Sequence, residues 1–191
     1  LGLINYSYNN KYILSAALRH DASSTLSPEN QSQLFPSASA AWRLDQENFI
    51  KNIAAIEQLK LRVGFGAVGN AGIAPYQTAG VLFRNPSYYN FGNSVAIGYN
   101  PEMFRSQVTW ERTVTKNLGI DYGFLEGRIS GAIDIYESNT NNIQRITLPG
   151  AGGIGSALVN LGNVNNKGLE IALSTVNIDR SGTRGGFRWT S

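Results

Sequence analysis

The sequence predicts an all-β fold: an antiparallel transmembrane β-barrel fragment of about eight strands that forms an open arc and not a closed barrel. Three observations predict it. Apolar residues alternate with small or polar residues over long stretches, long polar segments alternate with shorter turns, and charged residues make up only 15% of the 191 residues. Soluble domains carry about 25% charged residues, whereas small uncharged residues can line a polar barrel lumen.

The clearest alternation lies in residues 117–136 and predicts a β-hairpin, in which Gly127 supplies the positive φ of the turn at 125–128. Upstream alternation extends the first strand to about residues 108–124. At about 3.3 Å per residue and a tilt of about 45°, such a strand rises by about 40 Å and can cross a membrane.

Successive side chains of a strand point to opposite faces of the sheet, so alternate residues of each expected strand can be assigned to two faces. The side chains expected to face lipid are Leu118, Ile120, Tyr122, Phe124, Ile133, Ile135, Leu169, Ile171 and Leu173. Those expected to face the lumen are Arg19, Arg62, Asp121, Asp134 and Glu170. Glycines at inward positions, such as Gly64 and Gly119, predict a wide lumen, because bulky side chains fill the interior of a barrel of about eight strands.

The other elements are expected from the same alternation and from turn residues. They are a hairpin of residues 2–8 and 12–21, a loop at 22–34, a strand at 36–44, a short helix within 45–59, a strand at 59–70, long loops at 76–107 and 137–155, a strand at 166–178, a turn at 179–186 and a strand from Phe187.

The chain begins and ends within expected strands, so residues 1–191 are interpreted as an internal part of one barrel domain. We expect the signal peptide and the plug domain to lie outside it. We also expect the strands at residues 2–8 and 187–191 to be unpaired with each other.

Composition excludes several kinds of site. With no cysteine and one histidine there is no disulfide framework, no metal site of cysteine and histidine and no thiol nucleophile, and no cofactor is expected. A net charge of +3 is too small to favour nucleic acid as a partner. His20 is interpreted as an interfacial side chain near the membrane rim, because no triad partners can be assembled around it.

Two stretches match the dinucleotide-binding pattern G-x-G-x-x-G, at residues 64–69 and 150–155. That pattern needs a helix directly after it, with its N-terminus on the pyrophosphate. Asn70 to Pro75 follow the first match, and a run broken by Gly162 follows the second. We therefore interpret the first as part of a strand and the second as a glycine-rich loop tip.

Aromatic residues in the expected loop at 76–107 are the candidates for ligand binding, namely Tyr88, Tyr89 and Phe91. Exposed aromatic rings can stack on a sugar or peptide, although in a long loop they also pack the loop against itself. No catalytic or metal-binding residue is expected.

Four stretches carry a resemblance to a known family. They are KYILSAALRHDASS at residues 11–24, LKLRVGFGAVGNAGIAPYQ at 59–77, WERTVTKNLGIDYGFLEGRISGAIDIY at 110–136 and NLGNVNNKGLEIAL at 160–173. In this order they resemble the later part of the barrel of SusC-type (RagA-like) TonB-dependent outer-membrane transporters. Lys116 departs from the family pattern, which suggests a small polar residue there.

The resemblance implies a 22-stranded barrel with a plugged lumen in the cell outer membrane. It also implies energy from TonB, through a part of the protein outside this chain, a SusD-like surface lipoprotein as partner, and oligosaccharides or peptides as substrates. Outer-membrane lipid and lipopolysaccharide are the expected surroundings, and we expect Arg112 and Lys116 to meet the anionic outer leaflet or to be simply solvated.

Three readings remain open at this point. The leading hypothesis is nutrient uptake without chemistry on the substrate. The alternatives are a small β-barrel or β-sandwich that binds a ligand without transport, and a barrel-embedded hydrolase that would depend on His20 as its base.

Overall fold

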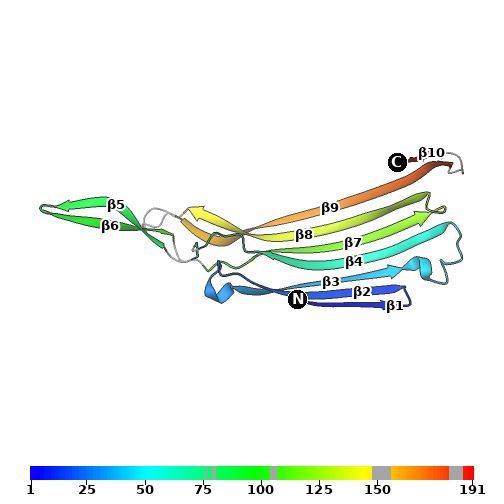
Figure 1. Cartoon of the computed structure of the whole chain (residues 1–191), viewed down its shortest axis with the longest axis horizontal. Helices are drawn as coiled ribbons and strands as arrows, with labels where there is room; N and C mark the ends of the chain where they lie inside the picture. Colours follow the sequence, from blue (N-terminus) through cyan, green and yellow to red (C-terminus); the bar gives the residue numbers. More distant parts are fainter. Residues whose placement is uncertain (76, 79–80, 104–106, 148–155, 181–186) are drawn as a thin grey trace.

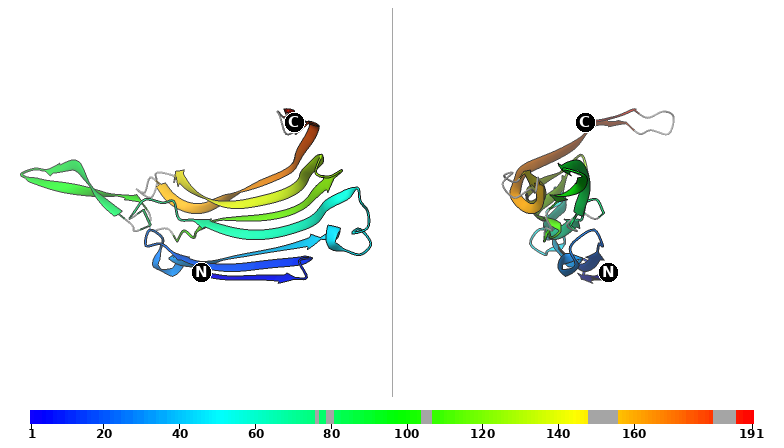
Figure 2. Two further views of the ribbon diagram at one scale, coloured as in Figure 1. Left: turned by 45° about the vertical axis from the view of Figure 1, so that its right-hand side comes forward. Right: turned by 90° about the vertical axis from the view of Figure 1, so that its left-hand side faces the viewer.

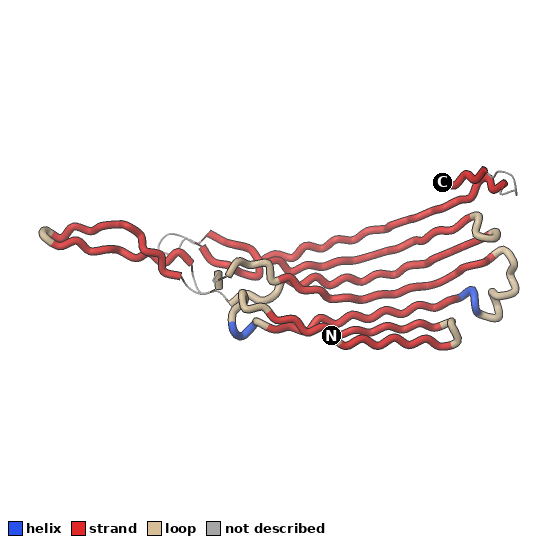
Figure 3. The backbone as a smooth tube through the Cα atoms, viewed as in Figure 1, coloured by secondary structure: helices blue, strands red, loops and turns tan. Residues whose placement is uncertain are grey.

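The structure is a computed structural model that describes residues 1–75, 77–78, 81–103, 107–147, 156–180 and 187–191. Its strands form a sheet of order β1-β2-β3-β4-β7-β8-β9-β6-β5, with β10 paired to β9. The strands are β1 (Gly2–Tyr8), β2 (Tyr12–Ala22), β3 (Ser32–Arg43), β4 (Ile56–Asn70), β5 (Val81–Phe91), β6 (Ser94–Met103), β7 (Glu111–Phe124), β8 (Ile129–Thr147), β9 (Ser156–Arg180) and β10 (Phe187–Thr190). Two short 3-10 turns, η1 (Pro28–Asn30) and η2 (Leu44–Gln46), are drawn as helix in Figure 3.

The sheet is a curved, open arc, as predicted. β1 and β10 lie at its opposite edges (Figure 1), and the view along the strands shows the sheet bending between them (Figure 2). The wall consists of β1 to β4 and β7 to β10, because β5 and β6 form a hairpin that projects beyond the ends of the other strands. The expected count of about eight wall strands is confirmed for the part of the chain that the structure describes.

The two ends of the sheet differ. At one end short turns join β1 to β2 and β7 to β8, in which Asn9, Asn10 and Gly127 take positive φ values of 49°, 53° and 74°, while the longer segment 44–55 joins β3 to β4. At the other end lie the segment between β2 and β3 and the β5–β6 hairpin (Figure 1). Short turns on the periplasmic side and long extracellular segments are typical of outer-membrane barrels.

The register assigns side chains to two faces, and it places one apolar row across seven strands. This row contains Tyr6, Leu14, Ala40, Val63, Leu118, Ile135 and Leu169, each opposite the next. We call the face with this row the outer face and the opposite one the inner face. Leu118, Ile135 and Leu169 remain 49%, 56% and 60% exposed. Exposed large apolar side chains in such rows need an apolar solvent, which a bilayer provides.

The buried core is small and lies at the long-segment end. It contains Leu26, Phe35, Ala67, Val108, Trp110 and Leu158. Pairing of β3 with β4 stops at Ser37 and Gly66, and the Phe35 ring packs edge-on against Trp110 at 5.5 Å beside the point where the two strands separate. The Trp110 Nε1–H donates to the Asn30 carbonyl at 3.1 Å, which ties the segment between β2 and β3 to the start of β7.

The expectation of a short helix within residues 45–59 is wrong. After η2 the backbone makes separate turns, such as Ile50 N–H to Glu47 O at 3.0 Å and Ile53 N–H to Ile50 O at 2.8 Å, and β4 begins at Ile56. The apolar residues that suggested helical spacing include Phe49, which is 67% exposed, and Ile53, which is 45% exposed. A short helix with no surface to pack against has little stability.

The segment expected to be a long loop at residues 76–107 contains two strands, because β5 and β6 pair within it. Phe91 and Ser94 are opposite each other, so Gly92 and Asn93 form a two-residue turn, in which Gly92 takes a φ of 62°. A Gly-Asn pair between two runs of strand-forming residues is a hairpin signal.

The expected loop at residues 137–155 corresponds largely to continued strand. β8 runs to Thr147 and pairs with β9 as far as Ser156, so both strands extend well beyond the neighbouring β7. The predicted strand at 108–124 begins later, at Glu111, because Val108 and Trp110 belong to the buried core. Most of the turn expected at 179–186 lies outside the described residues. No helix in the described part of the chain is long and apolar enough to cross a membrane.

Candidate functional site

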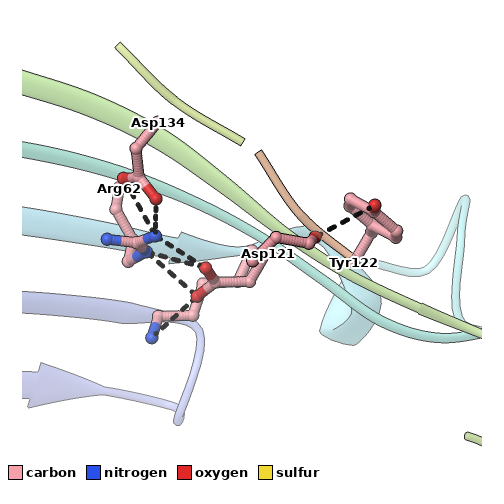
Figure 4. A network of polar contacts seen from close by, with 6 residues as sticks. Arg62, Asp121, Tyr122 and Asp134 are labelled. Carbon is pink, nitrogen blue, oxygen red and sulfur yellow. Dashed lines mark hydrogen bonds and ion pairs between the residues drawn. The ribbon is translucent and has the colours of Figure 1, made fainter. Parts of the chain in front are cut away.

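An ion-pair network on the inner face joins three neighbouring strands (Figure 4). Both oxygens of Asp121 on β7 accept from Arg62 Nε at 3.0 Å, and both oxygens of Asp134 on β8 accept from Arg62 Nη2 at 3.1 and 3.0 Å. Lys60 Nζ lies 3.5 Å from Asp121. These side chains are half-buried, and the two cations balance the two carboxylates. The network therefore adds polar, fixed groups to this face without adding net charge.

Gly119 makes this network possible. Register places Arg62 opposite Gly119, and Gly119 opposite Asp134, so the glycine lies between the arginine and the second carboxylate. A Cβ atom at Gly119 would collide with the Asp134 carboxylate and would lie 2.9 Å from Arg62 Nη2. The position is small because the side chains of its two neighbours meet over it.

Other inner-face glycines have the same role. A Cβ at Gly64 would meet the Asn117 amide, and a Cβ at Gly168 would lie 2.5 Å from the Tyr136 ring. At these positions larger neighbours on adjacent strands fill the space over the glycine, and the wide lumen stays a prediction. The inner surface alternates small and large residues, which packs the side chains against the sheet.

Hydroxyl pairs continue the inner face toward the long-segment end. Thr113 and Thr140 are 2.9 Å apart between their hydroxyl oxygens, and Thr115 and Ser138 are 3.2 Å apart. The predicted inward residue Glu170 lies opposite Asp134, is exposed and has no ion-pair partner among the residues described. Such a face can hydrogen-bond polar solutes. In the described parts of the chain it presents neither a nucleophile beside a base nor a cluster of side chains that could hold a metal ion.

A second polar centre lies at the short-turn end, where Glu47 accepts three hydrogen bonds. The donors are Trp42 Nε1 at 3.1 Å, Lys11 Nζ at 3.1 Å and the Tyr12 hydroxyl at 2.9 Å. The bonds from Trp42, Lys11 and Tyr12 hold the pKa of Glu47 below the ordinary value of a glutamate. The Tyr12 ring also stacks with Trp42 at 6.1 Å, so the carboxylate fixes an aromatic row.

Sequence reasoning identified some of these groups and missed others. Arg62, Asp121 and Asp134 share the inner face, as predicted, and Arg19 pairs with Asp21 at 2.9 Å while its guanidinium lies over Phe35. The contacts of Glu47 were not predicted, because they join positions 35 and 36 residues apart in the chain. The sequence offered one signal for these contacts, which is that the carboxylate of Glu47 follows Trp42 by five residues.

The candidate ligand residues lie on the projecting hairpin. Phe91 is at its tip and is 71% exposed. Tyr88 and Tyr89 pair through their backbones with Ile97 and Ala96. The side chains of these two tyrosines are not among those that the structure describes. Ligand binding at these residues stays a prediction.

The positions of His20 and of the first glycine pattern follow from the strand pairing. His20 lies opposite Leu34, and its side chain makes no hydrogen bond or ion pair within the described parts of the chain. The first glycine pattern, at residues 64–69, lies wholly within β4 and forms no phosphate loop. The second, at residues 150–155, lies outside the described residues.

Comparison with known proteins matches this architecture. A family model described as TonB dependent receptor-like, beta-barrel, matches residues 2–191. The TonB-dependent receptor SusC of Bacteroides thetaiotaomicron is 33% identical over 178 residues, which cover 91% of this chain and 18% of SusC. The TonB-dependent receptor P26 of Formosa agariphila is 33% identical over 195 residues, covering 100% of this chain and 19% of that receptor.

Solved structures of the RagAB peptide importer share the fold. In the "open-open" state the TM-score is 0.80 with 22% identity, covering 94% of this chain and 19% of that one. A structure of the RagAB peptide transporter gives a TM-score of 0.77 over 92% of this chain. The chain spans about a fifth of the length of the relatives it matches.

Proposed function

Because the chain belongs to the TonB-dependent receptor-like β-barrel family and forms part of the wall of an outer-membrane β-barrel, we propose that the whole protein takes up oligosaccharides or peptides across the outer membrane with a SusD-like surface lipoprotein. Energy would come from TonB. Residues 1–191 would be one part of a single barrel domain, and the plug, the TonB-contacting segment and the signal peptide would lie outside them.

The observation that carries this proposal is the 33% identity to SusC over 91% of the chain. The match runs through the barrel wall, so it supports a shared scaffold and a shared partner more directly than a shared substrate. The RagAB importer is named for peptides, and its likeness to this chain supports the fold. Both substrate classes therefore belong to the proposal.

The residues of this chain would act by position and not by chemistry. The inner face offers hydroxyls, amides and a neutral ion-pair network, which suit weak and exchangeable hydrogen bonds to a passing polar solute. The outer face supplies the apolar rows that hold the barrel in lipid. The exposed hairpin tip at Phe91 would meet the ligand or the lipoprotein outside the membrane.

The test is uptake by the host bacterium with the full-length gene deleted and then restored. Fluorescent oligosaccharides and fluorescent peptides are supplied separately, and a strain without TonB serves as the energy control. The proposal expects loss of uptake of one class on deletion, recovery on restoration and loss again without TonB. Unchanged uptake of both classes in the deletion strain would reject it.

The lipoprotein partner is tested by affinity purification of the full-length receptor from outer membranes in mild detergent. We expect a surface lipoprotein to copurify in a near-equal amount, as a stable complex requires. Purification of the receptor alone, under conditions that keep it folded, would reject the partnership.

A further inference from the structure

On β7, β8 and β9 the outer face changes from apolar to charged within one row of side chains, whereas the β4 member of that row is the exposed Phe65. Lys116, Glu137 and Lys167 lie opposite one another on β7, β8 and β9. The next row toward the short-turn end is Leu118, Ile135 and Leu169, which are all exposed and apolar. A sharp boundary of this kind marks the level at which the surroundings change from hydrocarbon to polar groups.

The height of this boundary fits the outer leaflet. Near the short-turn end, Tyr122 and Phe124 stack at 5.7 Å and form the aromatic edge of the apolar band. From Phe124 to Lys116 the strand covers about 26 Å at about 3.3 Å per residue, or a rise of about 19 Å at a tilt of about 45°. An apolar band is about 25 Å tall, so the charged row lies in roughly its last quarter, on the side of the long extracellular segments, where long cationic side chains can extend to the headgroups.

The charges at this edge are only partly paired, and Lys116 attracts the opposite Glu137 without forming an ion pair with it. Glu137 is already engaged, since its Oε1 accepts from Lys167 Nζ at 3.0 Å and from Asn165 Nδ2 at 3.0 Å. In the described parts of the chain Arg112 and Lys116 make no ion pair, and the buried Arg112 Nε–H has no hydrogen-bond acceptor. The Arg112 Nε atom is itself shielded from solvent, so a phosphate oxygen would form its charge-assisted bonds with the parts of Arg112 and Lys116 that line the groove.

Two adjoining grooves have the shape of an amphipathic ligand. A groove of about 310 Å³ is lined by Arg112, Val114, Lys116, Glu137, Asn139 and Asn141. A second of about 840 Å³ shares Lys116 and Glu137 with it and continues over Leu118, Ile135 and Leu169. A polar, cationic compartment, which borders the buried core at Val114, is thus continuous with an apolar one on the outer face.

We propose that this outer-face site binds lipopolysaccharide, with a lipid phosphate held by Arg112 and Lys116 and an acyl chain lying over Leu118, Ile135 and Leu169. The groove holds two cations, Arg112 and Lys116, against the one carboxylate of Glu137, an excess of positive charge that complements a phosphorylated glycolipid, and the Asn139 and Asn141 amides can hydrogen-bond its sugar hydroxyls. The inference depends on the outer-membrane location of the barrel and is independent of which solute it transports.

The test uses the full-length receptor purified in neutral detergent and freed of lipopolysaccharide. Purified lipopolysaccharide is titrated against thermal unfolding of the parent, of Arg112→Gln/Lys116→Gln and of the control Lys51→Gln/Arg128→Gln, which removes two cations at the short-turn end. The first variant should need at least about tenfold more lipopolysaccharide for the same increase in Tm. The control should behave as the parent does.

Two further measurements test which chemical groups of the ligand are recognised. Glu137→Gln removes the one carboxylate of the row and should lower the concentration of lipopolysaccharide needed. Dephosphorylated lipopolysaccharide and inorganic phosphate should each raise the Tm much less than the intact glycolipid. Equal titration curves for the two double variants, or an equal effect of free phosphate, would overturn the inference. Uptake measured on the same variants separates this outcome from failure of the proposed transport.

Discussion

Arg62 reaches Asp134 across Gly119, with two hydrogen bonds of 3.0 and 3.1 Å that join β4 to β8 over the intervening strand. The same guanidinium holds Asp121 on β7, so one side chain links three strands of the wall (Figure 4). A glycine in a strand is unfavourable by its entropy. At this position the loss is offset by a network that a larger residue would break.

Gly119→Ala should therefore destabilise the barrel by about 1–3 kcal/mol, because the added methyl group displaces Arg62 or Asp134. Gly66→Ala is the matched control, since the nearest atom to a Cβ there is Ser37 Cβ at 3.9 Å. Thermal unfolding of the two full-length variants checks the prediction. Equal stability would show that the network tolerates the methyl group.

The face assignment is tested by arginine at two neighbouring, half-buried positions of β8. Ile133→Arg places a cation on the outer face and should cost about 2–4 kcal/mol if the site is near the midplane of the bilayer. Ala132→Arg places it on the inner face, opposite Asp121 and Ala172, and should cost much less. Folding measured in lipid bilayers gives both values, and similar penalties would contradict the assignment of faces.

The Glu47 contacts predict a pH dependence. Its pKa is lowered in the folded state by hydrogen bonds from Trp42, Lys11 and Tyr12. A lowered pKa contributes stability that is present above the pKa of an unfolded glutamate, about 4.3, and that is lost as the pH falls through the lower folded value. We expect the Tm to fall in this acidic range for the parent.

Glu47→Gln removes the titrating group and should flatten that part of the Tm profile. Glu57→Gln, a substitution at an exposed carboxylate of β4, is the control and should leave the profile unchanged. A fall in Tm of the same size in the Glu47→Gln variant would assign the acid sensitivity to other groups.

Phe91 is the accessible member of the three aromatic residues predicted to bind ligand. If its ring stacks on the transported solute, Phe91→Ala should weaken uptake affinity by about two- to tenfold, because one aromatic contact contributes about 0.5–1.5 kcal/mol. Val95→Ala, at a residue 60% exposed on the same hairpin, should have no effect. Saturation curves for uptake separate the two, and identical curves would exclude Phe91 from the binding surface.

The positions of the wall strands and the two faces could be predicted from the sequence. A period of two is fixed by the backbone of a strand, so Leu118, Ile120 and Tyr122 had to share a face wherever the strand lay. The short turns were partly predictable, because Asn9, Asn10 and Gly127 are residues that accept a positive φ, whereas Leu125 and Glu126 take a φ of 57° without any such signal. The same reasoning failed for residues 76–107 and 137–155, where polar composition concealed β5, β6 and the extensions of β8 and β9.

Only the tertiary structure decided what each small residue is for and which distant groups meet. Local pattern cannot show that β4 pairs with β7, past the whole β5–β6 hairpin, or that Gly119 is the space over which Arg62 reaches Asp134. Glu47 meets Lys11 and Tyr12 for the same reason, since pairing of β2 with β3 returns the chain to its beginning. Alternation is a property of one strand, whereas ion pairs and filled glycine positions are properties of neighbouring strands in register.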